Sequence, residues 1–122
     1  MLFRSQIIKD KPEGFEVISG DDGITLPLMA CGAIGVISVV GNAYPKLVSD
    51  MVNSCLDGKF IEARPNHEKM LPLISSMFAE GNPSGVKAYL SELGITKNTF
   101  RLPVVGISDS LMESIKTLMK TV

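Results

Sequence analysis

Two stretches decide the expected fold: FEVISGDD at residues 15–22 and GAIGVISV at residues 32–39. Each is a short apolar run, as are the buried strands of a parallel α/β sheet. The first run stops at Gly20 and two carboxylates, and the second leads to Gly41 and Asn42. In such folds the carboxyl ends of the strands touch the ligand. We therefore expect an α/β architecture with a ligand edge at these two ends.

These are the only two good strand candidates in the sequence, and two parallel strands do not make a stable sheet. The chain is therefore expected to be part of a larger structure, with exposed strand edges that favour association. Proline and glycine breaks and apolar periodicity predict helices elsewhere. Pro65 and Pro72 predict a kink or break at one of them, with Pro65 the favoured position, because an interior proline costs about 3 kcal/mol. Asn42 is expected to cap the helix that starts near Pro45. The predicted helices cover residues 3–11, 22–32, 45–58, 60–78, 83–94 and 111–119, with 100–105 extended.

Composition narrows the class of protein. The chain has 122 residues, 45% of them hydrophobic, a mean hydropathy of +0.25 and a net charge of −1. No uninterrupted apolar run reaches the roughly 18 residues that span a bilayer, and no basic cluster suggests nucleic-acid binding. The amino terminus lacks a signal-peptide pattern. We expect a cytoplasmic protein that binds neither membranes nor nucleic acid.

Few side chains suggest chemistry by themselves. Asp21 and Asp22 fit helix capping better than a metal or acid–base pair. His67, the only histidine, is expected on a solvated helix surface, and Cys31 and Cys55 are expected to be buried thiols too far apart for a zinc motif. None of the nine lysines lies in an apolar strand, and Lys87 is expected to be exposed. Residues 35–39 remain open to two interpretations, a buried strand or a backbone edge that a ligand approaches.

Several motifs together carry a resemblance to a known family. Residues 14–22, and then 32–39 with Asn42, resemble the last two barrel strands of the dihydrodipicolinate synthase family, also called 4-hydroxy-tetrahydrodipicolinate synthases. The tail is similar to the helical extension of that family almost to its end. The matching tail motifs are Glu62-Ala63-Arg64, Leu71-Pro72-Leu73, Asn82-Pro83 with Lys87, Glu92-Leu93-Gly94 and Arg101-Leu102-Pro103.

The resemblance implies the carboxyl-terminal part of a (β/α)8 TIM barrel. Residues 1–58 would hold the last two strands, and residues 59–122 would form the helical extension. The first six strands have no counterpart in this sequence. The family is usually a homotetramer, so a homo-oligomer is expected.

The resemblance also implies an activity. The family condenses pyruvate with aspartate semialdehyde on the diaminopimelate route to lysine, through a Schiff base on a lysine and a proton relay through a tyrosine. Ile37 matches the position whose backbone touches pyruvate, and Gly20 matches a glycine that lines the same pocket. The Schiff-base lysine and the relay tyrosine have no matching position, since Tyr44 and Tyr89 lie in other motifs. We assign no catalytic residue, metal ligand or cofactor to the chain.

Three hypotheses follow. The first is the carboxyl-terminal portion of a synthase, inactive alone. The second is a non-catalytic module for assembly, or for complementation of a separately made amino-terminal half. The third is a related aldolase such as N-acetylneuraminate lyase, which shares the strand motifs but less of the tail.

Overall fold

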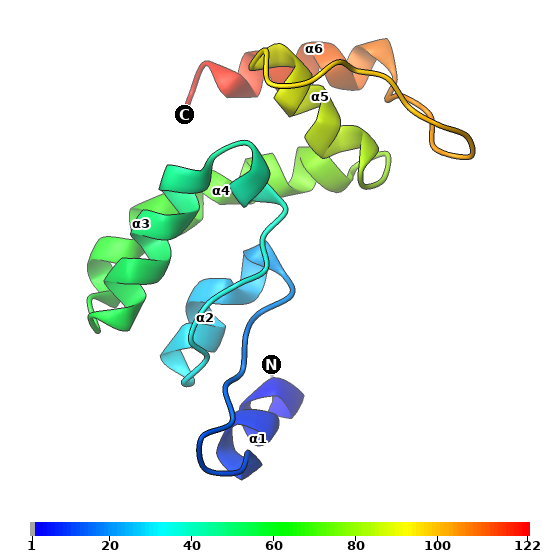
Figure 1. The fold of residues 1–122 in the computed structure, drawn as a ribbon. Helices are drawn as coiled ribbons and strands as arrows, with labels where there is room; N and C mark the ends of the chain where they lie inside the picture. Colours follow the sequence, from blue (N-terminus) through cyan, green and yellow to red (C-terminus); the bar gives the residue numbers. More distant parts are fainter. Residues whose placement is uncertain (1) are drawn as a thin grey trace.

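The computed structural model describes residues 2–122 of the chain. Its elements are α1 (Leu2–Asp10), η1 (Asp22–Ile24), α2 (Thr25–Ala30), η2 (Val40–Asn42), α3 (Pro45–Leu56), α4 (Phe60–Phe78), α5 (Ser84–Glu92) and α6 (Asp109–Met119). In Figure 1, α1 and α2 lie at one end, α3 and α4 pack in the middle, and α5 and α6 lie at the other end. No helix in this part of the chain is long and apolar enough to cross a membrane.

The two predicted strands are the main correction to the expected fold. Within residues 2–122 no regular strand forms, and the two runs are extended segments joined by a single parallel bridge, Ser19 to Val36. The backbone N–H of Ile34 donates to Val17 O at 2.9 Å, and that of Ile37 donates to Ser19 O at 2.9 Å. The first run therefore advances two residues while the second advances three. This extra residue interrupts the ladder, as a β-bulge does.

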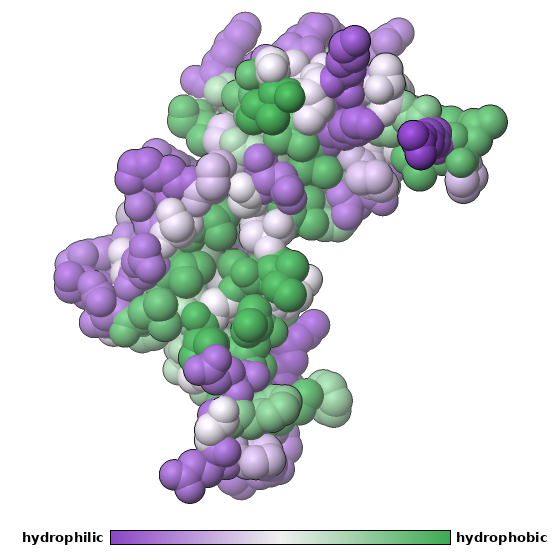
Figure 2. All heavy atoms as spheres, viewed as in Figure 1, coloured by the Kyte–Doolittle hydropathy of each residue, from purple (hydrophilic) through white to green (hydrophobic). Residues whose placement is uncertain are grey.

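The outer edges of the two runs are unpaired, which is a second reason why no sheet forms. Several large apolar side chains near them are exposed, with Ile18 at 50% and Ile37 at 78%. Figure 2 shows hydrophobic residues gathered over α2 and the extended runs beside it. The parallel pairing of the two runs is thus present in a reduced form, with an open apolar surface around it.

The core lies mainly between α4 and the helices that pack on it. α4 runs unbroken through Pro65 and Pro72, so the predicted break is wrong. Its buried stripe explains this result, because burial of large apolar side chains outweighs the cost of an interior proline. The fully buried residues of this stripe are Ala63, Met70, Leu73 and Met77.

Helix ends were mostly predictable. Pro45 occupies the first turn of α3, and Gly58 and Gly94 follow α3 and α5 with φ of +75° and +71°, a conformation that favours glycine. The capping role expected of Asn42 is wrong, because Tyr44 precedes α3 and the Asn42 amide donates to Ser38 O and Val39 O.

The segment between α5 and α6 is held by Lys87. Its ammonium group donates to Thr99 O and lies 4.8 Å from the centroid of the Phe100 ring. The lysine expected to be exposed therefore has two partners. The predicted extended segment 100–105 contains a turn, in which Val104 N donates to Arg101 O at 3.1 Å. Together these contacts fix the loop against α5.

Gly85 allows α5 to approach the end of α4. A Cβ atom at this position would lie 2.1 Å from Met77 O and 2.6 Å from Met77 C. These are backbone atoms, so a side chain can be accommodated only if the two helices move apart.

We predict that Gly85→Ala lowers the free energy of unfolding by roughly 1–3 kcal/mol, because the added methyl group overpacks this contact. Urea denaturation followed by circular dichroism measures the change. Gly35→Ala is the matched control, since nothing lies within 4 Å of a Cβ atom there. Equal stabilities of the two variants would contradict the close approach.

Glu80 ties the end of α4 to the start of α6. Ser108 N donates to Glu80 Oε2 at 2.7 Å, and the Ser108 hydroxyl donates to Glu80 Oε1. The same hydroxyl caps α6 by accepting from Leu111 N. The hydrogen bond from the Ser108 hydroxyl, followed by that from its backbone N–H, lowers the pKa of the Glu80 carboxyl.

This lowered pKa has a defined consequence for stability. At pH values above the ordinary pKa of glutamate, the hydrogen bonds between Glu80 and Ser108 stabilise the folded state. This contribution is lost as the pH falls through the lowered pKa of Glu80. We predict that Ser108→Ala raises the pKa of Glu80 toward its ordinary value, as measured by carboxyl-carbon NMR. Glu113, whose pKa is lowered by Lys116 instead, is the internal control and is expected not to change.

Candidate functional site

The ends of the two extended runs are joined by the buried side chain of Asp22, which is 4% exposed. Its carboxylate accepts a hydrogen bond from the Ser38 hydroxyl and two from backbone N–H groups, those of Val39 at 2.9 Å and Val40 at 3.3 Å. Hydrogen bonds to a charged acceptor are stronger than neutral ones. Asp22 therefore holds the loop after the second run, residues 38–40, against the loop after the first run, residues 20–22.

Asp21 has a different role. Its Oδ1 accepts from Gly23 N at 2.9 Å and so caps η1, which confirms the capping interpretation for this residue. Its carbonyl oxygen accepts from the hydroxyls of Ser19 and Thr25, both at 2.8 Å. The loop after the first run is thus held by hydrogen bonds among its own residues.

The clamp made by Asp22 is a feature that sequence reasoning missed. Its partners lie 16 to 18 residues further along the chain, beyond the reach of helical or strand periodicity. The nearest signal was the position of an acidic residue directly after a strand candidate. Only the structure shows that the Asp22 carboxylate accepts hydrogen bonds from the end of the second run.

The structure brings the regions of Gly20 and Ile37 to one edge. Ser19, next to Gly20, accepts the hydrogen bond from Ile37 N. Both residues are exposed, and nothing lies within 4 Å of a Cβ atom built on Gly20. Within residues 2–122 no hydrogen bond uses the Ile37 carbonyl oxygen. Because Ile37 is 78% exposed, this carbonyl is free to accept a hydrogen bond from a ligand.

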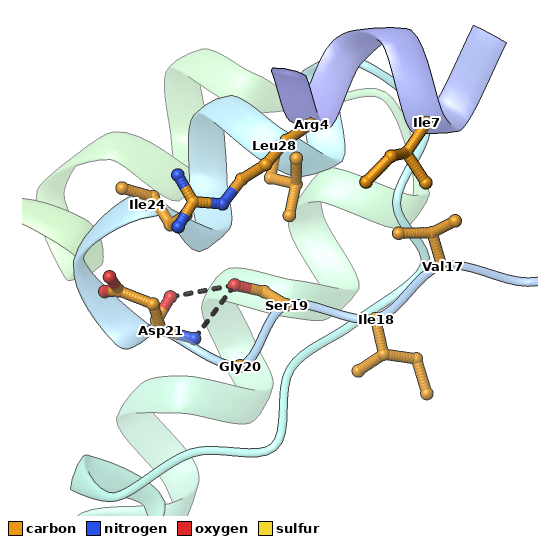
Figure 3. A pocket seen from close by; sticks show the side chains of 9 residues that line it. All are labelled: Arg4, Ile7, Val17, Ile18, Ser19, Gly20, Asp21, Ile24 and Leu28. Atoms are coloured by element: carbon orange, nitrogen blue, oxygen red, sulfur yellow. Dashed lines mark hydrogen bonds between the residues drawn. The ribbon is translucent and has the colours of Figure 1, made fainter. Parts of the chain in front are cut away.

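Two cavities meet at Gly20 and Asp21. The first, named here the α1 cavity, has a volume of about 450 Å³ and lies between α1 and the first run. Figure 3 shows Arg4 and Ile7 of α1 facing it across from Val17 and Ser19. The second, named the α4 cavity, has a volume of about 340 Å³. Its lining residues are Gly20, Asp21, Asp22, Val39, Ile74, Ser75 and Phe78. Ile37 lines neither cavity.

The aromatic hydroxyls support the core. Tyr89 is fully buried, shares a hydrogen bond of 2.7 Å with Ser76 Oγ, and packs edge-on against Tyr44 with ring centroids 6.1 Å apart. Burial raises the pKa of both tyrosines. Neither tyrosine lines a cavity at the strand ends.

The other singled-out side chains lie away from this edge. His67 is half-buried rather than solvated, and its Nδ1 has no hydrogen-bond partner. Cys55 is buried, as predicted, and burial raises its pKa, whereas Cys31 is exposed, contrary to expectation. Within residues 2–122 no three potential metal ligands gather.

Comparison with known proteins identifies the family. The model of the dihydrodipicolinate synthetase family matches residues 3–122. The chain belongs to this family. It is 48% identical over 113 residues to the 4-hydroxy-tetrahydrodipicolinate synthase of Phocaeicola vulgatus, a match that covers 93% of this chain and 38% of that relative.

Solved structures of the family agree with the fold. The chain matches part of the barrel enzyme from Aquifex aeolicus with a TM-score of 0.92 and 39% identity, covering 97% of this chain and 40% of that one. The chloride-inhibited synthase of Acinetobacter baumannii, complexed with pyruvate, matches with a TM-score of 0.91 and 30% identity, covering 96% of this chain and 40% of that one. The chain thus spans about two fifths of the length of these relatives.

We predict that Asp22→Asn lowers the free energy of unfolding by about 1–3 kcal/mol, because an amide cannot accept all three hydrogen bonds made by the carboxylate. Thermal and urea unfolding measure the loss. Asp21→Asn is the matched control, since asparagine caps a helix as well as aspartate does. A loss of the same size in both variants would argue against the clamp.

Proposed function

We propose that this chain provides part of the pyruvate site of a 4-hydroxy-tetrahydrodipicolinate synthase. The observation that carries the proposal is the hydrogen bond between Ile37 N and Ser19 O, which holds the Gly20 and Ile37 regions at one edge. Gly20 lines the pocket that receives pyruvate, and the Ile37 backbone contacts it. The reaction condenses pyruvate with aspartate semialdehyde in lysine biosynthesis.

The proposal also assigns a structural role to each of two segments of the chain. Residues 1–58 form the barrel segment, and residues 59–122 form the helical extension. The most extensive helix–helix contact, between α3 and α4, crosses this boundary. The extension therefore supports the barrel segment directly, through one continuous core.

The chain acts together with further barrel strands. The Schiff-base lysine and the relay tyrosine have no matching position in residues 1–122, and the outer edges of both extended runs are open. Parallel strands are stable only when neighbours and helices cover them. We propose that the complete site forms when the chain joins the remainder of the barrel, in a homo-oligomer. The relatives compared above are synthases, which favours this reaction over that of a neuraminate lyase.

A trapping experiment tests the proposal. With pyruvate and sodium borohydride, the 122-residue chain alone is expected to give no covalent adduct by mass spectrometry, because it lacks the Schiff-base lysine. Co-expression with the amino-terminal three fifths of the Phocaeicola vulgatus relative is expected to restore condensation and to place the adduct on that partner. An adduct on this chain, or no restored activity, would argue against the proposal.

Substitutions at the edge refine this test. Gly20→Val is expected to keep the fold, because nothing lies within 4 Å of a Cβ atom there, and it adds bulk at a residue that lines both cavities. We expect a loss in kcat/KM of about tenfold or more in the restored enzyme. Ile37→Ala is the control, since its backbone contact is kept. A larger loss of kcat/KM in Ile37→Ala than in Gly20→Val would contradict the roles assigned to these two residues.

A further inference from the structure

Three hydroxyl groups lie in the core on α4, on α5 and directly before α3. Tyr89 of α5 is fully buried, and its hydroxyl lies 2.7 Å from the Ser76 hydroxyl of α4. Tyr44, which precedes α3, packs edge-on against the Tyr89 ring. The hydroxyl oxygen of Tyr44 is also buried, but within residues 2–122 it has no hydrogen-bond partner. Because buried hydroxyls are rarely left unpaired, this one indicates a further group beside it.

The directions of the existing hydrogen bonds leave one acceptor unused. The Ser76 hydroxyl has a single proton, which it donates to Leu73 O at 2.9 Å. In its contact with Tyr89 the Ser76 oxygen therefore accepts, and the Tyr89 hydroxyl donates. The Tyr89 oxygen keeps its own lone pairs, and in the described part of the chain no other group donates to them. Tyr44 thus has an unused donor, and Tyr89 has an unused acceptor.

The two tyrosine hydroxyls are neighbours without direct contact. Their rings are inclined by 75°, with centroids 6.1 Å apart. Burial raises the pKa of Tyr44, and repulsion from the ionised form of Tyr89 raises it further, which is consistent with neighbouring hydroxyls. The two side chains share no hydrogen bond, since the Tyr44 hydroxyl has no partner. A small molecule that both accepts and donates can link two such groups.

We propose that the core holds one ordered water molecule, which accepts a hydrogen bond from the Tyr44 hydroxyl and donates one to the Tyr89 oxygen. Water suits this place because buried water typically pairs polar groups that have no other partner. A charged ligand would be poorly stabilised, because Tyr44 packs against the hydrophobic core. The water site lies apart from the proposed pyruvate site and does not depend on it.

The water connects the helical extension to the end of the second run. Tyr44 N donates to Val40 O at 2.9 Å, and Val40 N donates to the Asp22 carboxylate at 3.3 Å. α5 also packs against η2, the turn that contains Val40. The hydrogen bonds therefore lead from Ser76 and Tyr89 through the water to Tyr44, and from there to the clamp made by Asp22.

The sign of a stability change tests the water site. We expect Tyr44→Phe to raise the unfolding equilibrium constant of the full chain about fivefold, because a hydrogen-bonded hydroxyl is lost. A hydroxyl that is buried without a partner is destabilising, so its removal would instead lower this constant. Urea unfolding followed by circular dichroism measures the change. An unchanged or lower constant in Tyr44→Phe would overturn the proposal.

A double-mutant cycle tests the link from Tyr44 to Tyr89. The combined effect of Tyr44→Phe and Tyr89→Phe on the unfolding constant is expected to be about fivefold smaller than the product of the single effects, because the bridge is lost only once. The control cycle pairs Tyr44→Phe with Ser75→Ala and is expected to show no coupling. Ser75 is exposed on the same helix and donates to Leu71 O at 3.1 Å. Independent effects of the two tyrosine substitutions would contradict the bridge.

A crystal structure of the chain separates a water bridge from direct contact. We expect one electron-density peak at about 2.5–3.0 Å from both tyrosine oxygens. This peak is expected to be lost in Tyr44→Phe. A direct hydrogen bond between the two tyrosines, or no peak between them, would show that no water is bound there. A peak that persists in Tyr44→Phe would show that Tyr44 does not hold the water, and would equally overturn the proposal.

Discussion

The arrangement of this chain depends on one buried carboxylate. Asp22 holds three donors from the second loop and so fixes the distance between two segments that lack a regular sheet. A single parallel bridge supports this contact. Because the charge is buried, removal of its partners would leave an acceptor without compensation. Asp22 also lines the α4 cavity, so the same link fixes part of the wall of that cavity.

The helices were predictable from sequence because their signals are local. Pro45, Gly58 and Gly94 mark ends whose geometry is set within a few residues. The unbroken course of α4 through Pro65 and Pro72 was not predictable, since it depends on burial against partners distant in sequence. The two predicted strands do not form, for a related reason. Their apolar pattern is suited to a sheet covered on both sides, and within residues 2–122 the two runs form only one regular bridge.

The candidate site was predictable in part. The motifs led to Gly20 and Ile37, and the structure brings their regions together, whereas their roles toward pyruvate remain predictions. The contribution of α4 was invisible in the sequence, because Ile74 and Phe78 lie more than 50 residues from Gly20 and belong to an ordinary helical stripe. Family membership rests on matches along almost the whole chain, both to the family model and to the relatives.

Because α4 is continuous, it couples the positions of the elements that pack against it. This one helix contacts η1, where a Cβ atom built on Gly23 would lie 3.9 Å from Ile74 Cδ1, and it also packs against α5 and α6. Each residue turns an α-helix by about 100°. Insertion of one residue after Met70 would therefore rotate Phe78 and Met77 together, misaligning the cavity wall and the seat of α5 at once. A change in the length of α4 would thus disturb both contacts at once, whereas a substitution can alter one of them alone.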